Sequence, residues 1–148
     1  MDKLLSVFIT QLAMKKVLIF GIFDGVHPGH LNFLRQAKMR GDILVVAVGQ
    51  PSASKKFKDK LPEHSLTERI KFVRGIQYVD KVIPGDKEQG SYKIIPQEKP
   101  DIICLGYDQT ELKRDLKRWV EKNAPNISVQ TLRPYAPKKY HTSIIGGT

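Results

Sequence analysis

Apolar runs of strand length recur along the chain, and the clearest of them do not alternate with polar residues. Unbroken runs of this kind are typical of strands that are buried on both faces, as in a parallel sheet. The pattern predicts five strands, at Lys16–Phe20, Ile43–Val48, Lys81–Ile83, Asp101–Leu105 and Ile127–Leu132.

The segments between these runs place apolar residues at helical spacing, with polar residues on the opposite face. Ser65 and Glu68 form a capping-box pattern, which predicts that a helix begins at Leu66. Gly41 predicts the end of the first helix, because glycine readily adopts the left-handed conformation of a helix C-cap. Helices are expected at Pro28–Met39, Leu66–Gly75, Thr110–Asn123 and around Ser91–Gln97.

The order of these segments predicts the fold class. Strands that alternate with helices are typical of α/β proteins, in which helices cover both faces of a parallel sheet. No internal repeat, low-complexity tract or linker divides the chain. We therefore expect a single α/β domain over residues 14–148, with a parallel sheet of about five strands.

The first 13 residues stand apart from this pattern. Their apolar stretch is too short to span a bilayer and lacks the basic region and cleavage site of a targeting segment. Met14 comes directly before the first strand, so we expect residues 1–13 to be an N-terminal extension upstream of the natural start. The competing interpretation is a terminal helix that packs on the core.

Composition and charge narrow the class of protein and of ligand. The chain has 148 residues, of which 41% are hydrophobic and 27% charged, as is typical of a soluble globular protein. Its one cysteine, Cys104, lies in an apolar run, which predicts a buried, unreactive thiol and a cytoplasmic location. The net charge of +10 favours polyanionic ligands and leaves nucleotides, nucleic acids and anionic membranes open.

The segment Gly21–His30 joins the first predicted strand to the first predicted helix. A helix start exposes unpaired backbone N–H groups and the positive end of the helix dipole, which together attract anions. Pro28 suits the first helical turn, and Gly29 lets a ligand approach the backbone closely. His27 and His30 are three residues apart, so both imidazoles can donate to phosphate oxygens on one side of that turn.

This motif is longer than a pair of histidines. It comprises Gly21, Phe23, Asp24, His27, Gly29 and His30. In its strand–loop–helix context it resembles the signature of the cytidylyltransferase-like nucleotidyltransferases. Residues 66–83 and 99–109 are similar to that family's middle segment and to its fourth strand and ligand loop. The resemblance covers about residues 15–145 and implies a Rossmann-like domain of a kind that often forms homodimers.

Two groups of this family differ in the substrates that they imply. Residues 105–110 and 138–143 look most like the archaeal-type FAD synthases, which transfer AMP from ATP to the phosphate of FMN. The glycerol-3-phosphate cytidylyltransferases use CTP, and their last motif carries an arginine where this chain has residues 141–143, His-Thr-Ser. The missing arginine disfavours the cytidylyltransferases, so we expect an FAD synthase. A second departure from the family pattern is that the aspartate that often follows its second strand is absent here.

The resemblance implies a site for a nucleoside triphosphate and a phosphorylated acceptor. The backbone N–H groups of Ile22 and Phe23 would face the α-phosphate, and His27 and His30 would donate to the phosphates in the transition state. Mg²⁺ would come with the triphosphate, held mainly by phosphate oxygens and not by a protein metal site. Further nucleotide contacts are expected from Pro28, Gly29, Asp108 and Tyr135, and outer-phosphate contacts from Lys55 or Lys56, Thr142 and Ser143.

Each assignment has a plainer alternative. His27 and His30 fit ordinary capping histidines, Asp108 fits a turn residue before the next helix, and the lysines of residues 55–60 fit a flexible basic loop. Asp24 is expected to hold its loop through backbone hydrogen bonds. For a flavin ring, the apolar lining would come from Phe57, Tyr107 or Tyr140.

Other functions stay open at this stage. A sibling enzyme would use CTP and a small phosphorylated alcohol, and a degenerate member of the family would bind nucleotide without turnover. A basic nucleic-acid-binding module fits the charge, but no stacking motif with interleaved aromatics is present, so we expect neither a nucleic-acid nor a membrane partner. A zinc site at the two histidines lacks the Cys or carboxylate ligands that would complete it.

Overall fold

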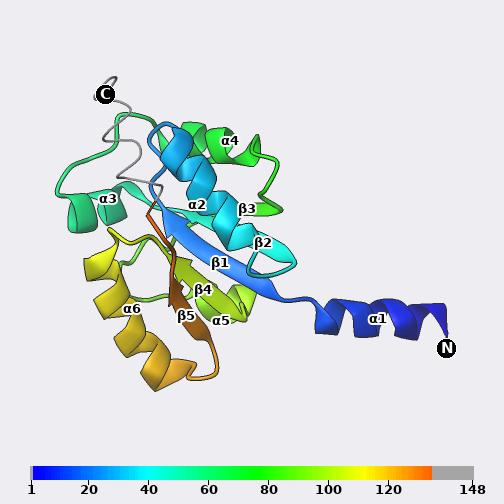
Figure 1. Cartoon of the computed structure of the whole chain (residues 1–148). Coiled ribbons are helices and arrows are strands. Elements are labelled where there is room, and N and C mark those ends of the chain that lie inside the picture. The colour runs from blue at the N-terminus through cyan, green and yellow to red at the C-terminus, as the bar shows by residue number, and fades with distance from the viewer. Residues whose placement is uncertain (1, 135–148) are drawn as a thin grey trace.

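The structure is a computed structural model that describes residues 2–134, apart from the side chains of residues 10–12. Five parallel strands form one sheet in the order β3-β2-β1-β4-β5, so the first strand is central (Figure 1). The strands are β1 (Lys16–Gly21), β2 (Ile43–Val48), β3 (Lys81–Pro84), β4 (Ile102–Leu105) and β5 (Ser128–Thr131). Each predicted strand is confirmed to within one residue at either end.

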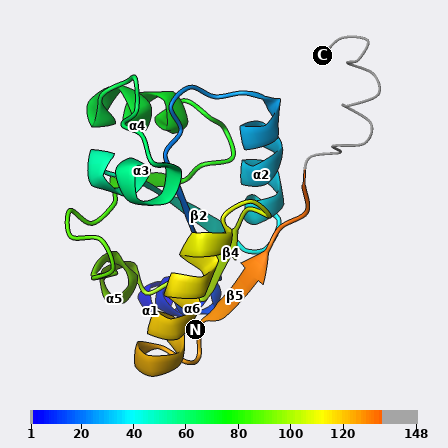
Figure 2. The same cartoon turned by 90° about the vertical axis from the view of Figure 1, so that its left-hand side faces the viewer.

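Helices cover both faces of this sheet, as the alternating pattern predicted (Figures 1 and 2). On one face, α2 and α4 pack on residues of β1 and β2 through side chains that include Leu34 and Val73. On the other face, α5 and α6 pack through side chains that include Ile95 and Leu116. The helices are α1 (Lys3–Ala13), α2 (Pro28–Lys38), α3 (Pro51–Lys58), α4 (Leu66–Arg74), α5 (Ile94–Glu98) and α6 (Thr110–Asn123).

The strands are buried on both faces because their apolar side chains point alternately into two cores. In β1, Val17 and Ile19 belong to the core under α2 and α4, and Leu18 belongs to the core under α5 and α6. Cys104 in β4 is fully buried, and burial raises the pKa of its thiol to about 11. This confirms the prediction of a buried cysteine, and a thiol of that pKa is unreactive.

Two sequence expectations about local structure are wrong. The basic segment after β2 is not a flexible loop but the helix α3, in which Ala53 and Phe57 share one face four residues apart. Helix α2 ends at Lys38 with a right-handed cap, so Gly41 is not a left-handed C-cap. A Cβ at Gly41 would lie 2.7 Å from the Val17 side chain, so close packing explains this glycine.

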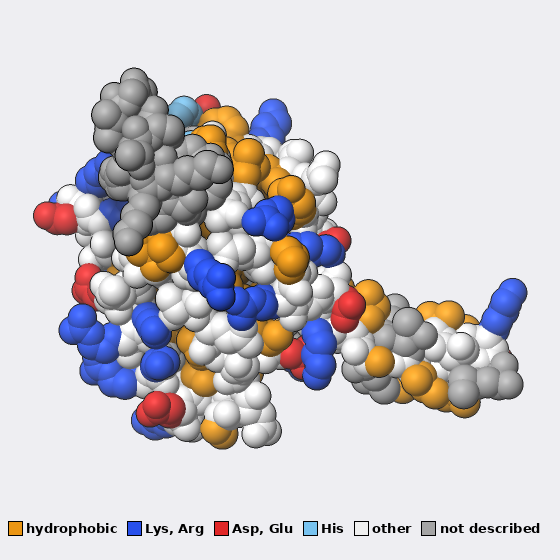
Figure 3. All heavy atoms as spheres, viewed as in Figure 1, with side chains coloured by type: hydrophobic (Ala, Val, Ile, Leu, Met, Phe, Trp, Pro, Cys, Tyr) orange, Lys and Arg blue, Asp and Glu red, His pale blue; other side chains and the backbone are white. Residues whose placement is uncertain are grey.

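Helix α1 projects away from the sheet beyond the start of β1 (Figure 1). Apolar side chains cover much of its surface (Figure 3), and Leu4 and Phe8 are 79% and 58% exposed. Among residues 2–134, no helix has both the length and the apolar character that crossing a membrane requires. That residues 1–13 lie upstream of the natural start stays a prediction.

Candidate active site

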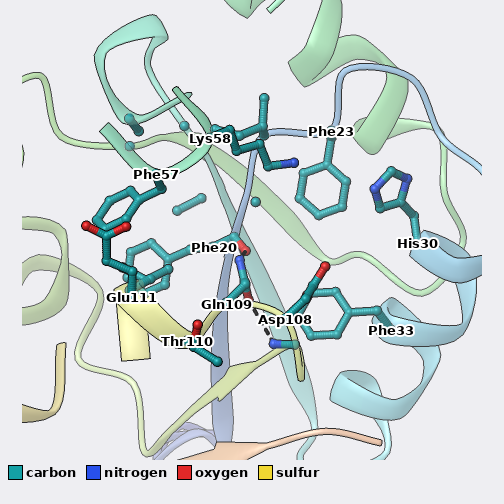
Figure 4. A pocket seen from close by; sticks show the side chains of 18 of the residues that line it. Phe20, Phe23, His30, Phe33, Phe57, Lys58, Asp108, Gln109, Thr110 and Glu111 are labelled. Carbon is teal, nitrogen blue, oxygen red and sulfur yellow. Dashed lines mark hydrogen bonds between the residues drawn. The ribbon is translucent and has the colours of Figure 1, made fainter. Parts of the chain in front are cut away.

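A pocket of about 860 Å³ opens beyond the carboxyl ends of the parallel strands, where ligands bind in open α/β sheets. Its lining comes from the loops after β1, β2, β3 and β4 and from helices α2, α3 and α6. Figure 4 shows His30 and Phe23 on one side of this pocket and Phe57 with Glu111 on the other. The predicted residues Ile22, Phe23, His27, Pro28, Gly29, His30 and Asp108 all line it.

The loop after β1 turns sharply at Phe23. Phe23 has a φ of 54°, in the left-handed region that side-chain-bearing residues rarely adopt, and its ring is nevertheless buried. The ring fits because Gly21 has no side chain: a Cβ there would lie 2.4 Å from Phe23 Cε2. The ring then lies against the imidazole of His30, with 5.3 Å between the ring centroids. Gly21 and Phe23 of the motif thus shape the turn that leads into α2.

Arg69 of α4 holds the backbone of this turn in place. Its guanidinium is fully buried, and Nη1 donates to the carbonyls of Ile22 at 3.0 Å and Gly49 at 2.7 Å. The carbonyl and N–H groups of one trans peptide point in opposite directions. Because the Ile22 carbonyl points at Arg69, the Phe23 N–H points away from Arg69.

Asp24 ties the same loop to the segment before α4. Its carboxylate accepts hydrogen bonds from the backbone N–H groups of Glu63 at 2.7 Å and His64 at 2.9 Å. The Glu63 bond is the largest factor that lowers the pKa of Asp24 to about 2, so the carboxylate is charged across the working pH range. This confirms the prediction that Asp24 holds the loop through backbone hydrogen bonds.

His27 and His30 form a reciprocal cap at the start of α2. Nδ1 of His27 accepts from the Gly29 N–H at 3.1 Å, and Nδ1 of His30 accepts from the His27 N–H at 3.3 Å. A ring nitrogen that accepts a hydrogen bond carries no proton, so the proton of each neutral ring lies on Nε2. The rings are stacked with centroids 3.8 Å apart. The pair therefore offers two Nε2–H donors.

The two interpretations of these histidines are not exclusive. Both residues cap α2, as the plainer alternative supposed, and both also line the pocket. The cap uses Nδ1 of each ring and leaves Nε2 for a ligand. Capping thus sets the orientation of the donors.

His30 is expected to stay neutral well below physiological pH. Burial, followed by the charges of His27 and Lys58, lowers its pKa to about 4, while Asp108 acts in the opposite direction. An NMR titration of the ligand-free protein should therefore place this pKa far below the ordinary 6.5. A value at or above 6.5 would contradict the described packing of His30.

The same shift predicts how stability depends on pH. The unfolded chain binds the His30 proton more tightly than the folded protein does, so the free energy of unfolding should fall as the pH drops from 6.5 towards 4. A His30→Gln variant should lose this part of the pH dependence. Urea unfolding of both proteins at several pH values between 4 and 7 measures the difference.

Asp108 lies in the loop between β4 and α6 and lines the pocket. The N-cap of α6 is Gln109, whose side chain accepts from the Gly106 N–H at 2.8 Å and donates to the Phe20 carbonyl at 2.9 Å. Asp108 is a turn residue before the helix, as the plainer alternative supposed, and its carboxylate has no hydrogen bond to residues 2–134. This geometry leaves Asp108 available to a ligand.

The lysines on α3 are arranged differently from the sequence expectation. Lys55 pairs with Asp59 at 3.6 Å, and Lys56 pairs with Asp115 at 3.8 Å. Neither lysine lines the pocket, whereas Lys58 does (Figure 4). Once the segment is helical, its phase decides which lysine reaches the site.

Three of the predicted contacts, Tyr135, Thr142 and Ser143, lie outside the described residues, as does Tyr140. Of the residues proposed to line a flavin site, Phe57 and Tyr107 do line the pocket. Among residues 2–134, no three His, Cys, Asp or Glu side chains are grouped as ligands for a metal ion.

Sequence reasoning missed the contacts of Arg69, and it favoured Lys55 or Lys56 over Lys58 at the pocket. The pair Glu68-Arg69 is part of the family resemblance, but nothing local indicates that Arg69 reaches Ile22 and Gly49. The only available signal was an arginine on the apolar side of a short helix, four residues before the buried Val73.

Known proteins are similar to this chain in both sequence and fold. The sequence model of the cytidylyltransferase-like family matches residues 18–146. An FAD synthase of Pyrococcus horikoshii is 39% identical over 124 residues, which are 84% of this chain and 83% of that protein. An FAD synthase of Archaeoglobus fulgidus is 41% identical over 114 residues, 76% of this chain and 80% of that protein.

Among solved structures, a lipopolysaccharide core biosynthesis protein from Thermoplasma volcanium superposes with a TM-score of 0.75 at 31% identity. The superposition covers 83% of this chain and 99% of that one, which agrees with the predicted Rossmann-like fold. The family match spans the turn at Phe23, the paired histidines and the loop of Asp108. The chain belongs to the cytidylyltransferase-like family.

Proposed function

We propose that the chain is an FAD synthase, which transfers AMP from ATP to the phosphate of FMN and releases pyrophosphate. The observation that carries the proposal is the pair of Nε2–H donors beside the Phe23 turn, at one side of a pocket with aromatic walls on the other. A pocket of about 860 Å³ lies near the upper end of the usual range for small-molecule sites, which suits two nucleotide substrates. Relatives named FAD synthase support the same activity.

The reaction requires the protein to hold two anions, ATP and the phosphate of FMN, in line. An oxygen of the FMN phosphate attacks the α-phosphorus of ATP, and the bond from that phosphorus to the oxygen bridging to the β-phosphate breaks. The attacking phosphate is already ionised near neutral pH, so the site needs no strong general base. Positioning and stabilisation of charge supply the acceleration.

The turn at Phe23 and the other residues that line the pocket have separate roles in this reaction. The Phe23 N–H and the Nε2–H groups of His27 and His30 donate to oxygens of the transferring phosphate, and the α2 dipole adds a fixed positive field. Lys58 neutralises the departing pyrophosphate, and Asp108 contacts the ribose or base. Mg²⁺ enters as part of the ATP substrate, bound mainly by phosphate oxygens.

The alternatives fit the molecule less well. A cytidylyltransferase for glycerol 3-phosphate has no use for the aromatic half of the pocket, because that acceptor is small and polar. A nucleic-acid-binding module leaves the histidine turn unexplained, and on the face in Figure 3 acidic side chains lie among the Lys and Arg side chains. A homodimer and a cytoplasmic location stay predictions.

One assay separates these functions. Pyrophosphate release is followed with ATP or CTP as donor and with FMN, glycerol 3-phosphate or phosphopantetheine as acceptor, and products are identified by mass. We expect turnover with ATP and FMN, giving FAD. Turnover only with CTP and glycerol 3-phosphate would overturn the proposal, and so would nucleotide binding without turnover on any acceptor.

A further inference from the structure

The half of the pocket away from His30 is a chamber with aromatic walls. Its lining comes from Phe20 of β1, Phe57 of α3, Tyr92, and Glu111 and Leu112 of α6. Figure 4 shows Phe57, Phe20 and Glu111 grouped on this side, apart from His30 and Asp108. Below, "the aromatic chamber" means these five residues.

Hydrogen bonds, an ion pair and ring contacts hold the side chains of the aromatic chamber in place. Tyr92 is 7% exposed, and its hydroxyl donates to Asp115 Oδ2 at 2.6 Å. The Phe20 ring meets the Tyr92 ring edge to face, with centroids 6.3 Å apart. Lys56 pairs with the same Asp115, and its Nζ lies over the Phe57 ring, 5.0 Å from the centroid. The chamber is thus preformed, which lowers the entropic cost of binding a rigid ring.

Glu111 gives the aromatic chamber one charged acceptor. Its side chain is exposed and has no hydrogen bond or ion pair with residues 2–134. A carboxylate accepts hydrogen bonds and donates none, so its partner must present an N–H or O–H group. A fitting ligand therefore combines a flat apolar ring surface with a donor at the edge of the ring.

The position of Asp108 separates the two substrates along the pocket. The proposed function places the nucleoside of ATP at Asp108, which lies between His30 and the aromatic chamber in Figure 4. The aromatic chamber is then left for the ring of the acceptor. FMN carries a planar tricyclic ring whose oxidised form has one N–H, at N3.

We propose that the aromatic chamber binds the isoalloxazine ring of FMN, stacked on Phe57, with its N3–H donating to the Glu111 carboxylate. This inference rests on the proposed function. It assigns Phe57 and Glu111 to acceptor recognition and separates them from the residues that act on phosphate. Lys56, which sequence placed at the triphosphate, supports the Phe57 ring instead.

The test measures FMN binding directly, by quenching of flavin fluorescence in the presence of a non-transferable ATP analogue. Phe57→Leu should weaken FMN binding by about 2- to 10-fold, and Glu111→Leu by about 3- to 10-fold, with binding of the ATP analogue unchanged. Phe8→Leu on α1 and Glu121→Leu on α6 are matched controls, since both side chains lie outside the pocket. Thermal unfolding checks that each variant is folded.

A modified flavin makes the test specific to Glu111. FMN methylated at N3 lacks the N–H, so the wild-type protein should bind it more weakly than FMN, and Glu111→Leu should bind both equally. Wild-type protein that binds no FMN would overturn the proposed function as well. Two outcomes would show that only the assignment of the aromatic chamber is wrong, provided that the wild-type protein binds FMN. In one, both variants weaken binding of the ATP analogue and not of FMN; in the other, neither variant weakens FMN binding.

Discussion

Replacing His30 with alanine is expected to lower kcat by about 10²–10³, because the variant loses one donor to the transferring phosphate. The affinity for ATP should change much less, since the interaction is strongest in the transition state. Initial rates of pyrophosphate release, with ATP and FMN varied separately, give both parameters. Leu31→Ala is a control on the same helix, at a partly exposed side chain outside the pocket.

His30 also caps α2, so the alanine variant alone does not separate catalysis from helix stability. Glutamine at this third helical position can accept the backbone N–H of His27, as in an ordinary capping box. His30→Gln should therefore keep most of the stability that alanine loses, and it should still lack the positioned imidazole donor. A folded His30→Ala protein with full activity would refute the role of His30.

Replacing Arg69 with methionine is expected to lower the free energy of unfolding by about 3 kcal/mol or more. The guanidinium donates to the carbonyls of Ile22, Gly49 and His64, and each buried carbonyl left without a donor costs about 1–3 kcal/mol. Urea unfolding measures the loss, with Arg74→Met, an exposed position on the same helix, as control.

The same substitution should reduce turnover beyond what instability explains. Without Arg69 the Ile22 carbonyl is no longer held, and the Phe23 N–H loses its fixed direction. We expect Arg69→Lys to be intermediate, because one ammonium on a flexible stem replaces a planar fork of donors. Wild-type stability and kcat in Arg69→Met would show that the turn does not depend on this contact.

The strand–turn–helix around the motif could be predicted because its signals are local. The apolar run of β1 gives the strand, Pro28 gives the first helical turn, and the motif spacing places both histidines at the helix start. Arg69 could not be assigned in this way, since two of its three acceptors, Ile22 and Gly49, lie 47 and 20 residues away in sequence. Hydrophobic periodicity shows which face of a helix or strand is buried, but not which distant residues that face contacts.

Helix α3 shows a second limit. Two apolar residues, Ala53 and Phe57, lie four residues apart among polar residues, which is a weak helical signal. The N-cap Gln50 makes no side-chain capping bond. Lysines at three of the last four positions then favoured a loop. The choice between Lys56 and Lys58 at the pocket depends on helical phase, so one error in secondary structure carried over to the site.

The link from Arg69 to two distant carbonyls also bears on how the protein folds. The turn at Phe23 takes its final geometry only after β1, β2 and α4 have come together, and such long-range closures form slowly. Nucleotide-binding competence should accordingly arise late in refolding. A partly folded chain, with its sheet incomplete, would not sequester ATP.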